Sequence, residues 1–187
     1  MPSRRLRLGL DTATTYLTMA LVDTDGRVVA RDAVRADRSH AAIVVPRLRD
    51  LFARAGTAPD DLTAVTAGVG PGSYTGVRVG LAVARGLAAG TGAVLGGADT
   101  LAMLAWSALR DGETGAAAID ARRGFAYVGV YRREGDLLRT LHEPVKIART
   151  EAAATHADAT WIEDEAPDAS WAAARPPRER PPAAVYL

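Results

Sequence analysis

Hydrophobic and polar residues alternate along the first 35 residues of the chain in the way typical of half-buried strands. Three such stretches occur there, and the acidic-glycine pair Asp25-Gly26 between the last two is typical of a hairpin turn. Over residues 40–55 the apolar positions instead recur every three or four residues, at 41, 44, 45, 48, 51, 52 and 55. This second pattern predicts an amphipathic helix.

The same kinds of pattern continue along the rest of the chain. They predict, in order, a strand at 62–68, a helix at 73–89, a strand at 93–97, a helix at 99–109, three more strands, a helix near 150–157, a strand at 160–163 and a helix near 168–174. The proline-rich residues 175–182 are expected to be extended, because proline cannot continue a helix.

An internal repeat organises these elements. Residues 10–22 align without a gap on residues 119–131, which places Asp11 opposite Asp120, and the same offset places Asp25-Gly26 opposite Glu134-Gly135. A strand meander followed by helix, strand and helix in each half predicts duplicated α/β units. We therefore expect two ribonuclease-H-like lobes with mixed sheets flanked by helices, the first at residues 1–110 and a second, reduced lobe at 111–187.

Composition narrows the class of protein without naming its function. The 187 residues are 48% hydrophobic, carry a net charge of +1 and include no cysteine, so we expect neither disulfides nor independent nucleic-acid binding. No apolar run reaches the length of a membrane span, and the first residues lack the apolar region of a signal peptide. These features predict a soluble, cytoplasmic protein that does not bind membranes.

The glycine-rich segment at 68–80 is the most informative motif. It lacks the lysine of a phosphate-binding loop, since Lys146 is the only lysine in the chain. The small residues that follow recur every four positions and would form one smooth ridge on a helix: Gly72, Gly76, Gly80, Ala84 and Ala88. The pattern does not decide whether this ridge packs on its own sheet or docks on a partner protein.

The segment Gly68 to Gly80 resembles the signature of the TsaB family, G-x-G-P-G-S-[FY]-T-G-[LV]-R-[IV]-G. Further stretches resemble the same family: residues 8–14, Ser39-His40 leading to Pro46, residues 120–124 before Tyr127 and, more weakly, the closing residues 185–187. The resemblance implies a part in making threonylcarbamoyladenosine in tRNA. It also implies the actin/hexokinase-like fold, which the internal repeat resembles independently.

In active members of that fold, an acidic residue ending the first strand of each lobe faces the nucleotide phosphates and the metal. Asp11 and Asp120 stand at those positions, but the Asp-x-Gly pattern is broken by Ala13 and Arg122, and no glycine follows Gly135. We therefore expect a degenerate phosphate site, with no cofactor and no catalytic residue. The histidines His40, His142 and His156 are scattered, so we also expect no metal site.

By resemblance, the chain is a non-catalytic scaffold that binds a TsaD-like transferase, with a TsaE-like ATPase joining the complex. It would form a homodimer when alone and would meet tRNA only through the complex. The family's contact surface corresponds to the helices at 40–55 and 73–89. The interface candidates there are Ala41, Val45, Leu48, Phe52, Gly72, Gly76, Val79, Gly80, Val83 and Leu87.

Two alternatives remain open from the sequence. The chain could be an autonomous ATP-dependent kinase or phosphatase that uses Asp11 and Asp120, or a homodimer with no enzyme partner. A Ser-His-Asp triad is disfavoured because Ser73 lies outside a G-x-S-x-G elbow.

Overall fold

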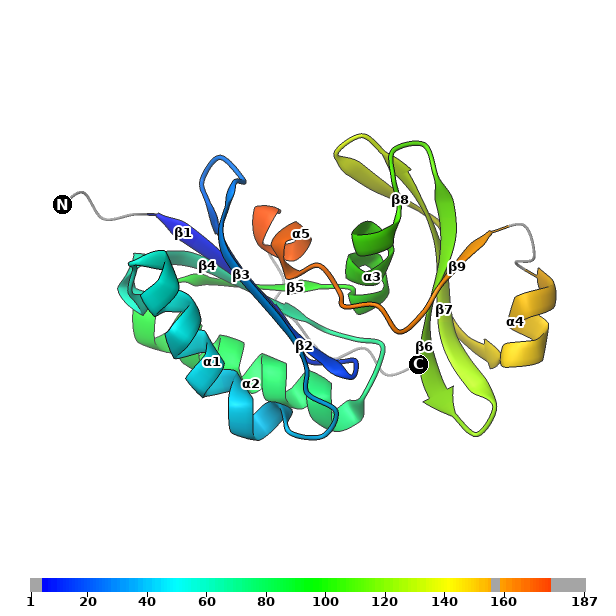
Figure 1. The fold of residues 1–187 in the computed structure, drawn as a ribbon, viewed down its shortest axis with the longest axis horizontal. Coiled ribbons are helices and arrows are strands. Elements are labelled where there is room, and N and C mark those ends of the chain that lie inside the picture. The colour runs from blue at the N-terminus through cyan, green and yellow to red at the C-terminus, as the bar shows by residue number, and fades with distance from the viewer. Residues whose placement is uncertain (1–4, 156–158, 176–187) are drawn as a thin grey trace.

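The computed structural model describes residues 5–155 and 159–175, which form two lobes, each built on one β-sheet (Figure 1). His156, the expected tail beyond residue 175 and the closing residues 185–187 lie outside this described part.

The first lobe contains a five-stranded mixed sheet in the order β3-β2-β1-β4-β5. Its first three strands form an antiparallel meander, and β4 and β5 run parallel to β1. The strands are β1 (Leu6–Asp11), β2 (Tyr16–Asp23), β3 (Val28–Arg35), β4 (Leu62–Gly68) and β5 (Val94–Ala98). The short 3₁₀ turn η1 (Pro59–Asp61) leads into β4.

Two long helices, α1 (His40–Ala55) and α2 (Tyr74–Thr91), cover one face of this sheet, and a short helix, α5 (Ala169–Ala174), covers the other (Figure 1). The apolar stripe of α1 is buried on the sheet through Val44, Leu48, Leu51 and Phe52. At the start of α2, the Ser73 hydroxyl accepts a hydrogen bond from the Gly76 N–H at 3.2 Å. This contact satisfies one of the free N–H groups of the first turn and fixes where the helix begins.

The second lobe contains a four-stranded sheet in the order β8-β7-β6-β9. Its strands are β6 (Thr114–Arg122), β7 (Phe125–Glu134), β8 (Leu137–Ala148) and β9 (Thr160–Ile162), with β9 parallel to β6. Helices α3 (Thr100–Ala108) and α4 (Arg149–Thr155) lie on opposite faces of this sheet (Figure 1).

The two lobes exchange helices. Helix α3 follows the last strand of the first sheet but packs on the second sheet, and α5 follows the last described strand of the second sheet but packs on β1, β2 and β4 of the first. The boundary proposed at residue 110 stays a prediction, because α3 is linked to the first lobe by sequence and to the second by packing.

The structure confirms the expected fold class and the order of elements. The helix at 40–55 and the strand at 62–68 match the expected bounds, and the other predicted elements agree to within a few residues. Both acidic-glycine turns are present, with Gly26 and Gly135 in the left-handed region at φ 83° and 59°. Local sequence patterns decide these features, so the sequence alone could reveal them.

Candidate functional site

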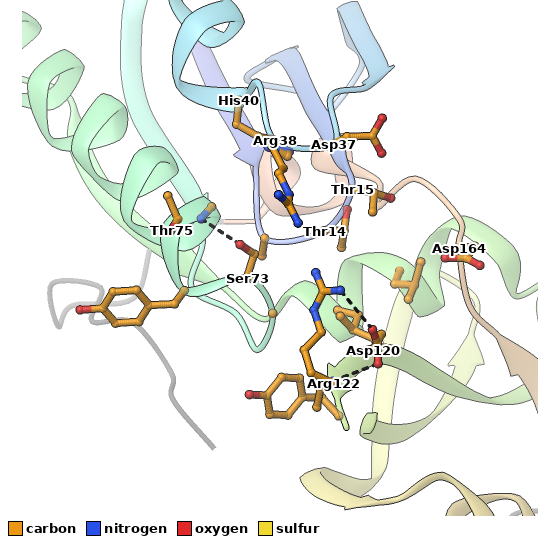
Figure 2. A pocket seen from close by; sticks show the side chains of 18 of the residues that line it. Thr14, Thr15, Asp37, Arg38, His40, Ser73, Thr75, Asp120, Arg122 and Asp164 are labelled. Carbon is orange, nitrogen blue, oxygen red and sulfur yellow. Dashed lines mark hydrogen bonds and ion pairs between the residues drawn. The ribbon is translucent and has the colours of Figure 1, made fainter. Parts of the chain in front are cut away.

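A cleft of about 720 Å³ separates the two lobes and is the candidate site of this protein (Figure 2). The first lobe contributes the β1–β2 turn and the N-terminal ends of α1 and α2, and the second contributes the end of β6 and the acidic residues after β9. Figure 2 shows Arg38 from the first lobe and Arg122 from the second pointing toward each other across this cleft.

Asp120 lines the cleft, as its position at the end of β6 predicts. Its carboxylate, however, is engaged by residues of its own turn. Its carboxylate accepts the Arg122 backbone N–H at 3.0 Å and lies 3.8 Å from the Arg122 guanidinium. Arg122 and Arg123 have φ values of 67° and 54°, which are unfavourable for residues with long side chains. The second-lobe carboxylate is therefore already hydrogen-bonded to its own turn and lies beside an exposed guanidinium.

Asp11, the first-lobe counterpart, is absent from the lining of the cleft because it is completely buried. One carboxylate oxygen accepts the Thr100 hydroxyl at 2.7 Å, and the other accepts the Ala13 N–H at 2.9 Å. Burial raises the pKa of Asp11 to about 6, although the hydrogen bonds from Thr100 and Ala13 favour the charged form. Asp11 is thus an internal hydrogen-bond acceptor, and water in the cleft does not reach it.

These residues do not fit the magnesium-nucleotide site implied by the fold. Such a site needs free carboxylates and backbone N–H groups close to the phosphates. In the β1–β2 turn the Ala13 N–H is engaged with Asp11, and the Ala13 carbonyl accepts the Ser73 N–H at 2.7 Å. Residues 5–155 and 159–175 contain no group of three or more potential metal-ligating side chains.

The small-residue ridge of α2 faces inward. A Cβ atom added at Gly72 or Gly76 would collide with the carbonyl oxygen of Ala13 or Thr12, and one at Gly80 would lie 2.5 Å from the Thr12 hydroxyl. The ridge therefore packs on the β1–β2 turn of its own lobe. The expectation that Gly72, Gly76 and Gly80 contact a partner stays a prediction, while the structure shows that residues 12 and 13 of the same lobe lie against them.

The other interface candidates divide by exposure. Leu48 and Phe52 are buried in the core of the first lobe, so within the isolated chain their side chains pack on that core. Val79, Val83 and Leu87 are partly buried against that core. Ala41 and Val45 are exposed, and 59% of Val45 is accessible.

The outward face of α2 carries a second set of small residues that the sequence pattern did not single out. Ala82, Gly86 and Gly90 are exposed, and among residues 5–155 and 159–175 a Cβ atom added at Gly86 or Gly90 would meet nothing within 4 Å. A spacing of four residues between small side chains does indicate a smooth helix face, but α2 carries two sets of small residues with this spacing. Only the position of the sheet decides which set faces outward.

Residues 32–169 match the family of TsaD, tRNA N6-adenosine threonylcarbamoyltransferase. The chain is 40% identical over 129 residues to the tRNA threonylcarbamoyladenosine biosynthesis protein TsaB of Escherichia coli, an alignment that covers 68% of this chain and 55% of that protein. It is 32% identical over 131 residues to TsaB of Bacillus subtilis, covering 70% and 57% of the two chains. The chain belongs to the TsaB family.

Solved structures agree with membership of the TsaB family. YeaZ from Pseudomonas aeruginosa superposes with a TM-score of 0.74 at 29% identity, covering 88% of this chain and 87% of that one. A second structure, of a protein described as similar to peptidase YEAZ from Pseudomonas aeruginosa, gives a TM-score of 0.76 with the same coverage. The chain spans about half the length of the curated TsaB relatives it matches.

Proposed function

We propose that this chain is a non-catalytic scaffold subunit in the biosynthesis of threonylcarbamoyladenosine in tRNA, and that it binds and supports a TsaD-like transferase. The names of its TsaB relatives support the pathway, and the matching transferase family supports the class of partner. The observation that carries the scaffold role is the outward face of α2, where Gly86 and Gly90 are open to solvent.

Exposed glycines in a helix carry a stability cost that a close contact with a partner can offset. Each destabilises the helix by about 0.5–1 kcal/mol relative to alanine. The inward glycines Gly76 and Gly80 pack closely on Thr12, whereas a Cβ atom added at Gly86 or Gly90 would meet no described residue within 4 Å. A partner helix that approaches the outward face closely would supply such a contact. The exposed Val45 of α1 adds apolar surface on the same helical layer.

The contacts of the cleft support a role without catalysis. Ser73, His40 and Asp37 all line it, and as a set they could suggest a peptidase. However, the Ser73 hydroxyl caps α2, the His40 Nε2 atom lies 3.0 Å from the Tyr16 carbonyl, and Asp37 pairs with Arg35 at 3.2 Å. None of these contacts is the serine–histidine or histidine–aspartate hydrogen bond of a triad. The engaged states of Asp11 and Asp120 likewise count against the alternative of an autonomous kinase or phosphatase.

The remaining parts of the proposal concern the assembly. A TsaE-like ATPase would join the pair, tRNA would be bound through the complex, and the outward face would allow a homodimer when the transferase is absent. No helix among the described residues has the length and apolar character that crossing a bilayer requires. A cytoplasmic location agrees with the proposal.

Reconstitution tests the proposal directly. The chain is mixed with a TsaD-like transferase, a TsaE-like ATPase, a threonylcarbamoyl-adenylate-forming enzyme, ATP and tRNA, and the modified nucleoside is measured by mass spectrometry. We expect modification only when this chain and the transferase are both present. Modification by this chain without the transferase would show that it is catalytic, and equal modification with and without this chain would refute the scaffold role.

A further inference from the structure

The junction between the lobes lies at the start of α3. The chain leaves β5 of the first sheet at Ala98 and begins α3 at Thr100, and α3 then packs on the second sheet. Any change in the angle between the lobes must therefore pass through Asp99 and Thr100 or through the return segment between β9 and α5 (Figure 1).

Thr100 ties this junction to the first lobe. Its hydroxyl donates to Asp11 at 2.7 Å, and its backbone N–H donates to the Gly70 carbonyl at 2.9 Å. Thr100 and Asp11 are both fully buried. Gly68 leaves room for the carboxylate, because a Cβ atom there would collide with Asp11. Opening the junction would break a hydrogen bond that water could not readily replace.

Asp99 ties the same junction to the second lobe. One of its carboxylate oxygens accepts the Leu101 N–H at 2.8 Å and caps α3, while the other accepts the Tyr131 hydroxyl at 2.8 Å. Tyr131 lies on β7 and is 1% exposed. Two consecutive residues are thus bound in opposite directions, Thr100 to the first sheet and Asp99 to the second.

We propose that the pairs Thr100–Asp11 and Asp99–Tyr131 form a latch that holds the two lobes at one fixed angle without a bound ligand. Asp11, whose position corresponds to a nucleotide-site acid in the related fold, then has a conformational role: it receives the hydroxyl that anchors α3. The latch keeps the cleft at one width, so nucleotide is not needed to set it. This inference concerns the isolated chain and does not depend on the proposed partner.

The cysteine-free sequence permits a direct test. Cysteines introduced at the exposed positions Asp60 in the first lobe and Thr140 in the second accept one spin label each. Pulsed dipolar spectroscopy then measures the distribution of distances between the lobes. We expect a single narrow distribution for the otherwise unchanged protein, with or without magnesium and ATP. The labelled protein is diluted into an excess of unlabelled protein, so that the distances measured lie within one chain. A broad or two-peaked distribution in that sample would overturn the latch before any variant is made.

Substitutions separate the latch from general packing. Thr100→Val removes the hydroxyl at nearly constant volume, and Thr100→Ser retains a hydroxyl. We expect the width of the distribution to increase at least twofold in Thr100→Val and to stay unchanged in Thr100→Ser. Tyr131→Phe tests the second pair independently and should also broaden the distribution. A folded Thr100→Val protein as narrow as its parent would refute the latch, and if that variant does not fold, a narrow distribution in Tyr131→Phe refutes it equally.

Discussion

Asp11 shows how a residue recognisable from the sequence can have a role that its position alone does not predict. Its place at the end of the first strand matches a phosphate-site acid, yet its carboxylate is buried between Thr100 and the Ala13 N–H. Its pKa is raised to about 6 because burial disfavours the charged form more than these hydrogen bonds favour it. The ionised side chain therefore costs folding free energy at neutral pH.

The pH dependence of stability should reveal this cost. The pKa of Asp11 is about 6 in the folded chain, against 3.8 for an aspartate exposed to water, so the folded state holds this proton more tightly. The resulting stabilisation is complete below about pH 4 and is lost as the pH rises through 6, with a size of about 3 kcal/mol. In Asp11→Asn this contribution is absent.

Urea unfolding at a series of pH values measures the effect. Relative to Asp11→Asn, the parent protein should lose about 2–3 kcal/mol of unfolding free energy between pH 4 and pH 7. Parallel stability profiles for the two proteins would contradict the buried, ionisable state of Asp11.

Helix α2 has two small-residue faces with different roles. The inward face fits the β1–β2 turn at Thr12 and Ala13, and the outward face has open space above Gly86 and Gly90. Both faces belong to one helix, so the same kind of substitution can be made on each. On the inward face it tests folding, and on the outward face it tests association.

Leucine at the two faces should have opposite effects on stability. Gly80→Leu inserts bulk against Thr12 and Leu10 and should reduce the unfolding free energy by about 1–3 kcal/mol. A Cβ atom at Gly86 meets no described residue within 4 Å, so Gly86→Leu should raise it by about 0.5–1 kcal/mol through helix propensity. Thermal unfolding followed by circular dichroism distinguishes the two results.

Association should follow the outward face. Gly86→Leu should weaken binding to a TsaD-like partner by about one to two orders of magnitude, because overpacking at a close helix contact costs about 1–3 kcal/mol. Glu151→Leu, at an exposed position on α4, is a matched control that should leave binding unchanged. Calorimetric titration measures both variants, and full affinity in Gly86→Leu would exclude this face from the interface.

Helix α5 provides a further test of how elements are placed. Gly9 on β1 lies directly under it, and a Cβ atom there would collide with the Ala169 carbonyl and lie 3.0 Å from the Ala173 nitrogen. Gly9→Ala should therefore lower the unfolding free energy by about 1–3 kcal/mol. Gly90→Ala, with no described neighbour within 4 Å of the added methyl group, should raise it by about 0.5–1 kcal/mol. Equal effects in urea unfolding would contradict the close packing of α5 on β1.

At the scale of the whole molecule, the cleft should not bind magnesium-ATP with useful affinity. Asp11 is buried, Asp120 is paired with Arg122, and the Ala13 N–H is engaged. Arg122→Gly relieves the unfavourable backbone conformation of this turn. It leaves the Asp11 carboxylate buried and hydrogen-bonded to Thr100, so it should not restore nucleotide binding. Isothermal titration calorimetry that detects a magnesium-dependent site of low-micromolar affinity in the parent protein would contradict this prediction.

The sequence by itself determined the elements and the duplicated architecture of this protein. Amphipathic spacing, the Ser73 cap and the acidic-glycine turns act over a few residues, so their outcome can be read locally. The same holds for the loss of glycine beside both aspartates, which predicted a degenerate phosphate site. The family motif also lies within one continuous segment.

Only the tertiary structure decided which face of α2 is buried, where Asp11 points and which sheet receives α3 and α5. Each of these depends on contacts between residues far apart in sequence, such as Thr100 with Asp11 and Gly9 with Ala169. The sequence of a helix with small residues on two faces does not indicate which face is buried. Likewise, the sequence around an aspartate at the end of a strand does not indicate whether its carboxylate faces solvent or accepts a hydrogen bond from a distant hydroxyl. The packing of the two sheets makes those choices, because it alone fixes which surfaces lose contact with water.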